Sequence, residues 1–233
     1  MDKKVAVITA GGGGMGEAIT RKLHKNGYCV ALMSRSDASE TLAKECEGLG
    51  LRGSVTEAAD LERLVSMTLE AYGRIDAVVN HTAHPPKGEL LEIPDDGWLS
   101  GFNMLIMSVV RMARLVTPVM QKQGGGAWVN ISTFAAFEPE LALPVSCTLR
   151  AGLSAFSKLY ADRYAAENIR MNNLLPGFID SLPHSAETVN RVPMARIGTT
   201  KEIADTTDFL LSDGAAYITG QSLIVDGGVT RHI

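Results

Sequence analysis

Short runs of apolar and β-branched residues recur along the chain and alternate with longer segments of helical periodicity. Such runs are typical of strands that are covered on both faces. They lie at residues 5–9, 28–33, 75–80, 127–131, 171–175 and 222–225. The helical pattern is found at residues 61–72, 100–122, 146–167 and 201–212. This alternation predicts an α/β fold with a doubly wound parallel sheet, right-handed crossovers and helices on both faces.

The chain length changes this picture little. With 233 residues, no internal repeat and no linker rich in Pro, Gly or Ser, the sequence predicts a single domain over residues 1–233. α/β folds of this length commonly form one unit. The composition, with 45% hydrophobic and 21% charged residues, is that of a globular protein and excludes disorder, collagen and coiled coil for the whole chain.

Charge and cysteine content narrow the class of partner. The formal net charge is -4, and no cluster of Lys and Arg is longer than a pair, which argues against nucleic acid and favours a small molecule. No apolar stretch approaches the ~20 residues of a membrane span, and we expect no membrane association. The 3 cysteines have no C-x-x-C spacing, which indicates a reducing, cytoplasmic setting and no metal site.

A glycine-rich loop, residues 9–16, follows the first predicted strand directly and leads into a helix-forming segment. Free N–H groups and a helix dipole at such a turn form an anion site that suits a pyrophosphate. Glycine also serves tight turns for steric reasons alone, but the position in a βαβ series favours a dinucleotide. The predicted cofactor contacts here are Thr9, Gly11, Gly14, Met15 and Gly16.

The second predicted strand ends at Ser34 and Arg35. An acidic residue at this place would hold the ribose hydroxyls of NAD, whereas a hydroxyl and a cation suit the 2′-phosphate of NADP. We therefore expect NADP, with NAD or no cofactor as the alternatives. An arginine here is also compatible with a solvated surface residue.

The ordered motifs resemble those of the short-chain dehydrogenase/reductase family over essentially the whole chain. Residues 9–16 are similar to its T-G-x-x-x-G-x-G, 79–83 fall at its N-N-A-G, and 176–181 are similar to its P-G-x-I-x-T. The resemblance implies a Rossmann fold and a substrate-side segment at about 176–200. It also implies homo-oligomers, dimers or tetramers, that pair helices 100–122 and 146–167. Further cofactor contacts implied by the resemblance are Asn80, Pro176, Gly177 and Ser181.

The family's catalytic Ser, Tyr and Lys correspond here to Thr133, Ser146 and Arg150. An alkyl hydroxyl is a far weaker acid than a phenol with pKa ~10, and a guanidinium keeps its proton near neutral pH. The family's proton relay is therefore absent. A fixed charge on Arg150, with hydroxyls at Thr133 and Ser146, could still stabilise an oxyanion. The family's first loop glycine is Ala10, and its helical asparagine falls at Leu105.

The proton donor stays open among His81, His84, Glu138 and water. Both histidines follow the fourth strand, where imidazole could act as an acid, although a loop histidine bonded to backbone is the simpler interpretation. Glu138 and Glu140 lie between Thr133 and Ser146 and could face the pocket, whereas loop carboxylates are usually solvated.

Three functions remain compatible with these residues. The first is an atypical NAD(P)-dependent oxidoreductase acting on a small carbonyl, an alcohol or an activated double bond. The second is a non-catalytic nucleotide-binding or regulatory homologue that has lost the relay. The third is a lyase similar to halohydrin dehalogenases that uses Arg150, but the glycines of the cofactor loop argue against it.

Overall fold

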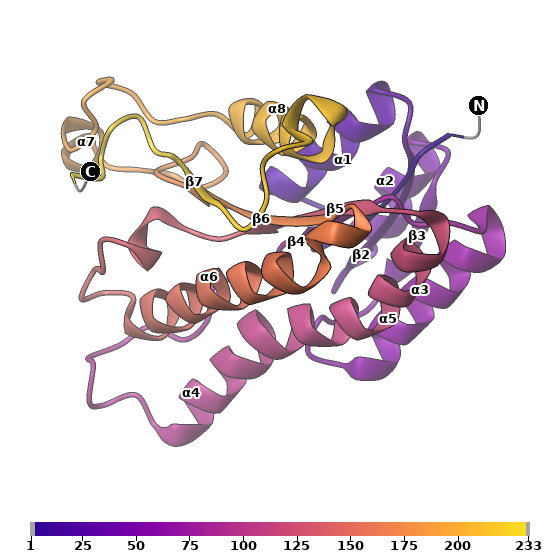
Figure 1. Cartoon of the computed structure of the whole chain (residues 1–233). Helices are drawn as coiled ribbons and strands as arrows, with labels where there is room; N and C mark the ends of the chain where they lie inside the picture. The colour runs from indigo at the N-terminus through magenta and orange to yellow at the C-terminus, as the bar shows by residue number, and fades with distance from the viewer. Residues whose placement is uncertain (1–2, 232–233) are drawn as a thin grey trace.

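The computed structural model describes residues 3–231 and contains one seven-stranded parallel sheet with the order β3-β2-β1-β4-β5-β6-β7 (Figure 1). The strands are β1 (Val5–Thr9), β2 (Cys29–Ser34), β3 (Leu49–Arg52), β4 (Ala77–Asn80), β5 (Gly126–Ile131), β6 (Ile169–Pro176) and β7 (Ser222–Val225). The order reverses between β1 and β4, where ligands of doubly wound folds bind at the carboxyl ends of the strands. The predicted fold class is confirmed.

Helices cover both faces of the sheet (Figure 1). One face is covered by α1 (Gly14–Lys25), α2 (Ala38–Glu45) and α8 (Thr200–Leu211), and the other by α3 (Ala58–Tyr72), α5 (Ser108–Gln123) and α6 (Pro144–Tyr164). Apolar side chains spaced at helical intervals, such as Leu61, Leu64 and Val65 of α3, are buried against the strands. The amphipathic pattern therefore fixes which side of each helix meets the sheet.

The prediction from apolar runs missed strand β3. This strand is only four residues long, stands at the edge of the sheet and has Gly50 in place of an apolar side chain. A Cβ at Gly50 would lie 2.6 Å from Cα of Glu40, so the glycine lets α2 pack directly on the strand. A strand whose glycine allows a helix to approach its backbone closely shows only a weak pattern of apolar residues in the sequence.

One long helical segment runs from Asp95 to Gln123 and joins α4 (Asp95–Phe102), a π-helical turn (Asn103–Met107) and α5. By length and composition alone it could cross a membrane, which corrects the expectation that no such stretch exists. Its buried face, with Met112, Val116 and Met120 inaccessible to solvent, packs on the sheet. We interpret it as a core helix of the domain.

A row of polar side chains crosses four strands at one level. Asn80, Asn130, Asn173 and Ser222 are register partners on β4, β5, β6 and β7. Nδ2 of Asn80 donates to Oδ1 of Asn130 at 2.7 Å, and Nδ2 of Asn130 donates to Oδ1 of Asn173 at 3.0 Å. Ser157 of α6 closes the network by accepting from Nδ2 of Asn130 at 3.0 Å. The buried amides satisfy one another, as buried polar groups must.

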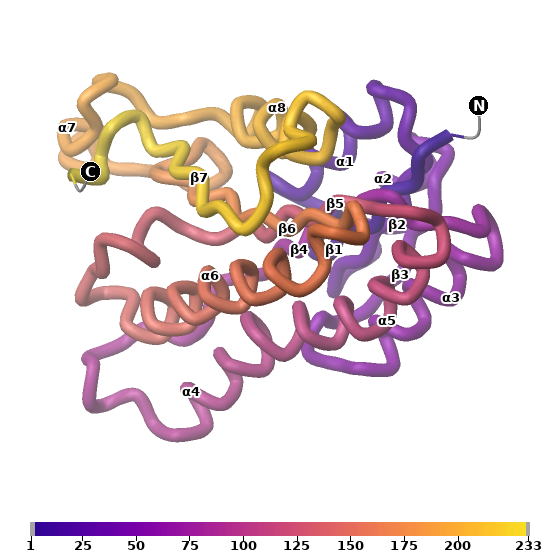
Figure 2. Tube along the Cα trace, in the orientation of Figure 1, coloured from indigo at the N-terminus to yellow at the C-terminus, as the bar shows by residue number. Residues whose placement is uncertain are grey.

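The loops that follow β4, β5 and β6 gather at one end of the molecule (Figure 2). Segments 83–94, 137–143 and 178–198 lie there, together with α4, α7 (Ala186–Asn190) and the last described residues. The polar row reaches the carboxyl ends of β4 and β5, where Asn80 is the last strand residue and Asn130 the last but one.

Candidate active site

A cavity of about 780 Å³ lies at the carboxyl ends of β1, β2 and β4. The glycine-rich loop, the end of β2 and the residues just after β4 form much of its wall. Its lining includes Gly12, Gly13, Ser34, Arg35, His81 and Thr82. This is the position at which a doubly wound sheet binds a dinucleotide.

The glycine-rich loop brings three chain segments close together. A Cβ at Gly16 would lie 2.1 Å from the carbonyl oxygen of Ala10, so this position requires glycine. Gly14 has a φ of +53°, and a Cβ there would lie 3.4 Å from Cβ of Ser181. No side chain caps the start of α1 at Gly13. The exposed start of α1 and its dipole fit a pyrophosphate, with Ser181 close by.

Several predicted cofactor contacts serve the framework around the cavity. Thr9 is buried, and its hydroxyl donates to the carbonyl of His81 at 2.8 Å and accepts from its N–H at 2.9 Å. Asn80 belongs to the buried polar row. Gly11 packs under β2, since a Cβ there would lie 2.9 Å from Cβ of Leu32.

The remaining predicted contacts lie at the two ends of the glycine loop. Met15 is half-buried in the first turn of α1 and packs on the core. Pro176 ends β6, and the N–H of Gly177 donates to the carbonyl of Val225 at 2.9 Å. These contacts fix the start of segment 176–181, whose Ser181 lies against Gly14.

Two cations lie at the neighbouring ends of β2 and β3: Arg35 follows β2, and Arg52 ends β3. The hydroxyl of Ser34 is used locally, because it donates to the carbonyl of Ser36 at 3.0 Å and accepts from the N–H of Ser39 at 3.1 Å. Arg35 lines the cavity, and Arg52 is the register partner of Ser34 on β3. Among residues 3–231, no carboxylate pairs with either arginine. Sequence reasoning missed Arg52 because the strand that places it was not recognised.

Arg150 joins the ends of β4 and β5. Its side chain is only 5% exposed, and Nη1 donates to the carbonyl of Ile131 at 2.7 Å. Nη2 reaches Oγ1 of Thr82, which lines the cavity, at 3.5 Å. Burial lowers the pKa of Arg150 to about 10, so the group remains a cation at neutral pH.

Thr133 follows the β5 end that Arg150 contacts, and Ser146 lies on the same helix as Arg150. Thr133 follows β5 and caps a short 3-10 helix (Phe134–Ala136), accepting from the N–H of Ala135 at 3.4 Å. Ser146 is buried in the first turn of α6, one turn before Arg150. The 3-10 helix and α6 pack on each other. The three candidate catalytic residues thus come from adjoining elements at the carboxyl end of the sheet.

His81 and His84 differ in their surroundings. Nδ1 of His81 is buried without a hydrogen-bond partner in the described part of the chain. Burial and the charge of Arg150 lower the pKa of His81 to about 4, against the opposing effect of the Ala10 carbonyl. His84 is exposed, and partial burial with the charges of Lys87 and Arg150 lowers its pKa. Both rings are therefore poor donors of a proton at neutral pH.

Glu138 and Glu140 hold neighbouring segments in place. Oε1 of Glu138 accepts from the N–H of Arg231 at 3.0 Å, and Glu140 forms an ion pair with Arg191 in the substrate-side segment. Both line a separate cavity of about 380 Å³. Within residues 3–231, no group of three His, Cys, Asp or Glu residues could hold a metal ion.

The helical position of the family's asparagine lies in the π-helical turn. Leu105 occupies it and is 1% exposed. Asn103, two residues earlier, instead donates to the carbonyl of Thr56 at 3.3 Å and accepts from Arg111 at 2.6 Å. This asparagine therefore fixes the helix to the cavity wall formed by Thr56.

Comparisons with known proteins give consistent results. A family model described as enoyl-(acyl carrier protein) reductase matches residues 10–230. Dehydrogenase/reductase SDR family member 4 of Oryctolagus cuniculus is 33% identical over 246 residues, covering 99% of this chain and 95% of that protein. The 3-oxoacyl-(acyl carrier protein) reductase of Thermotoga maritima is 30% identical over 242 residues, covering 98% of each chain.

A solved structure is similar over the full length. L-sorbose reductase from Gluconobacter frateurii, complexed with NADPH and L-sorbose, has a TM-score of 0.93 and 27% sequence identity. The match covers 100% of this chain and 98% of that one.

Proposed function

The chain belongs to the short-chain dehydrogenase/reductase family of NAD(P)-dependent oxidoreductases, and we propose that it reduces a small carbonyl compound with NADPH, using Arg150 in place of the family's lysine. The observation that carries the proposal is the buried guanidinium of Arg150 at the joined ends of β4 and β5, bonded to a residue of the cavity wall. The proposal makes this an atypical member of the family, with Thr133 and Ser146 as hydroxyl donors.

The residues around the cavity fit NADPH. The pyrophosphate would lie at Gly12, Gly13 and the start of α1, where no side chain caps the helix. Position 12 has no room for a side chain, since a Cβ there would lie 2.8 Å from Oγ of Ser34. Arg35 and Arg52 would hold the 2′-phosphate. The similar L-sorbose reductase is complexed with the same cofactor. When bound, NADPH supplies a hydride to the carbonyl carbon.

Arg150 then stabilises the charge that develops on the substrate oxygen. As hydride adds to the carbon, the π electrons of the C=O bond move to oxygen, and a buried cation stabilises that oxyanion strongly. Thr133 and Ser146 donate hydrogen bonds to the same oxygen. Water supplies the proton that completes the alcohol, since at neutral pH Arg150 retains its own proton and His81 is uncharged.

A turnover assay tests the proposal. NADPH oxidation would be followed over a panel of carbonyl compounds, with NADH in parallel. We expect Arg150→Ala to lower kcat/KM about a hundredfold and Ser146→Ala less, because a charge-assisted hydrogen bond is about twice as strong as a neutral one. Lys158→Ala, on the exposed side of α6, is the control. An enzyme that binds NADPH but reduces nothing, with Arg150→Ala unchanged, would support a non-catalytic, regulatory role instead.

We also propose a homo-oligomer, a dimer or tetramer, in the cytoplasm. An apolar groove of about 410 Å³ lies between α5 and α6 and includes Phe156, Leu159 and Tyr164. Leu159 is 69% exposed, which favours a covering partner. Cys29, Cys46 and Cys147 are free thiols, as suits a reducing compartment.

A further inference from the structure

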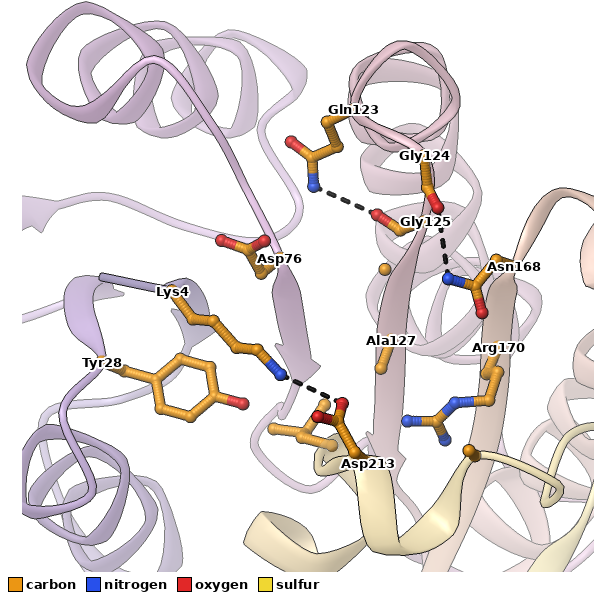
Figure 3. A pocket seen from close by; sticks show the side chains of 13 residues that line it. Lys4, Tyr28, Asp76, Gln123, Gly124, Gly125, Ala127, Asn168, Arg170 and Asp213 are labelled. Carbon is orange, nitrogen blue, oxygen red and sulfur yellow. Dashed lines mark hydrogen bonds and ion pairs between the residues drawn. The ribbon is translucent and has the colours of Figure 1, made fainter. Parts of the chain in front are cut away.

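The protein has two buried arginines at opposite ends of its sheet, and their surroundings differ. Arg170 lies at the amino end of β6, beside a small polar cavity into which its guanidinium points (Figure 3). It donates to the carbonyls of Leu210 at 2.8 Å, Ser212 at 3.1 Å and Ile218 at 3.3 Å. The carboxylate of Asp213 lines the same cavity. Arg170 thus has three main-chain acceptors, and a carboxylate lines the cavity beside it.

Arg150 has fewer acceptors than Arg170. One carbonyl, that of Ile131, accepts from it at 2.7 Å, and the contact with Thr82 is long at 3.5 Å. A guanidinium has five N–H donors, so three of them have no acceptor among residues 3–231. No carboxylate of the described chain pairs with it. A buried, unpaired cation is costly to keep.

Two more polar atoms, on residues next in sequence to the two that Arg150 contacts, are buried without a partner among residues 3–231. Nδ1 of His81 follows β4, and Oγ of Ser132 follows Ile131 at the end of β5. The region thus holds a cation, an imidazole nitrogen and a hydroxyl whose hydrogen-bonding capacity is unused. Buried groups of this kind are usually satisfied, and a cluster of them at one place indicates a ligand that supplies the missing partners.

The missing negative charge has no source in the site itself. Ser146, one helical turn before Arg150, does not ionise near neutral pH. The reduced nicotinamide and its ribose are neutral, and the pyrophosphate would be held at the start of α1. The substrate is then the remaining source of a counter-charge.

We propose that Arg150 binds a carboxylate of the substrate, which makes the substrate class a small oxo acid rather than a neutral ketone. The inference rests on the proposed function, because it assigns the substrate of that same site. A planar guanidinium with free N–H groups matches a carboxylate in a bidentate arrangement, whereas a halide offers no such geometry. Two free N–H groups of Arg150 would hold the carboxylate, and the third would donate to the oxygen of the neighbouring carbonyl, whose carbon receives the hydride.

The test measures binding without turnover. Oxamate, a carboxylate analogue of a 2-oxo acid, and oxamide, its neutral counterpart, would be titrated calorimetrically into the NADPH-loaded protein. We expect oxamate to bind at least tenfold more tightly than oxamide. Arg150→Met should abolish this preference, and Arg150→Lys should reduce it, since lysine keeps the charge but lacks the planar fork. Arg170→Met is the matched control and should leave the preference intact.

Each other outcome is decisive. Equal affinity for oxamate and oxamide in the native protein would overturn the inference, even if Arg150→Met failed to fold. Binding of bromide with no binding of oxamate would also overturn it, in favour of a halide site. Reduction of neutral ketones without an oxamate preference would overturn the inference and leave the proposed function standing. Selective oxamate binding with no reduction of any carbonyl would support the inference and refute the proposed function.

Discussion

Nε of Arg52 donates to the main-chain carbonyl of Arg35 at 3.2 Å, so the last residue of β3 lies beside the residue that follows β2. The contact uses one N–H of Arg52, and no carboxylate among residues 3–231 pairs with its Nη atoms. Arg35 lines the part of the cavity that would hold the adenosine ribose, and Arg52 lies directly behind it through this contact. The proposed selection of NADPH would then depend on residues at the ends of two strands.

Substitution of either arginine should weaken NADPH selectively. We expect Arg35→Ala and Arg52→Ala each to raise the Kd of NADPH about tenfold, because a hydrogen bond to a charged group contributes about 1.5 kcal/mol. The Kd of NADH should change little. Fluorescence titration with both cofactors measures this, and Arg21→Ala, which removes a cation paired with Glu45, is the control. Equal loss of both cofactors would show that the arginines only support the fold.

Ala10 has a φ of +48°, in the region that favours glycine. We expect Ala10→Gly to stabilise the protein by about 0.5–1 kcal/mol, because relief of about 1–2 kcal/mol of backbone strain exceeds the entropic cost of about 0.4–1 kcal/mol. Denaturant unfolding measures the change. Ala18→Gly inside α1 is the control and should destabilise by about 1 kcal/mol. A loss of stability on Ala10→Gly would contradict the argument.

Removal of one member of the polar row should have a large effect. Asn130→Ala leaves Nδ2 of Asn80 without its acceptor in the core and removes one of the two donors to Oδ1 of Asn173, the other being Ser157. We expect the free energy of unfolding to fall by about 3 kcal/mol, since each orphaned buried group costs about 1–3 kcal/mol. Asn26→Ala removes only an exposed bond to Asp208 and should cost less than about 1 kcal/mol. Similar losses for the two variants would refute a role of the row in stability.

Acidification should destabilise the protein through His81. Its pKa in the folded state is lowered from 6.5 to about 4, so the unfolded chain binds a proton that the folded chain refuses. The stabilisation is complete above about pH 6.5 and is lost as the pH falls towards 4, by an amount on the order of 3 kcal/mol. His81→Asn should remove this part of the pH dependence. An NMR titration of the ring with a midpoint near 6.5 would be incompatible with the expectation.

A charge in the groove between α5 and α6 should break the proposed oligomer. We expect light scattering to give a mass well above 24.9 kDa for the native protein and a lower mass for Leu159→Glu. Burying an unpaired carboxylate in an apolar interface is unfavourable. Leu141→Glu, at a loop position that is 90% exposed, is the control and should keep the native mass. A native mass near 24.9 kDa would refute the oligomer.

Much of the fold could be predicted because its strands are buried on both faces. The bounds of β1 and β7 agree with residues 5–9 and 222–225, and the other predicted strands differ from the structure at their ends by one or two residues. β3 could not be predicted from apolar periodicity, since Gly50 is there for its lack of a side chain. The same failure concealed Arg52, whose place depends on that strand.

The candidate site was less predictable because sequence shows residue types but not their partners. Ser34 and Thr9 have the right chemistry for a cofactor, yet their hydroxyls are committed to backbone groups of the loops. Glu138 and Glu140 similarly hold loop segments. Arg150 is the opposite case. Our proposals for it rest on N–H donors that have no acceptor among residues 3–231, which the sequence does not reveal.

The polar row also bears on how the strands find their alignment. Apolar side chains tolerate small sliding along a neighbour, whereas an amide at one level requires its complement at that same level. A slip of one residue in β5 would turn Asn130 to the opposite face and place apolar Val129 or Ile131 against Asn80 and Asn173. Misaligned sheets would therefore bury several unsatisfied amides at once. The row therefore disfavours every other strand register and stabilises the one in which the ends of β4 and β5 meet at Arg150.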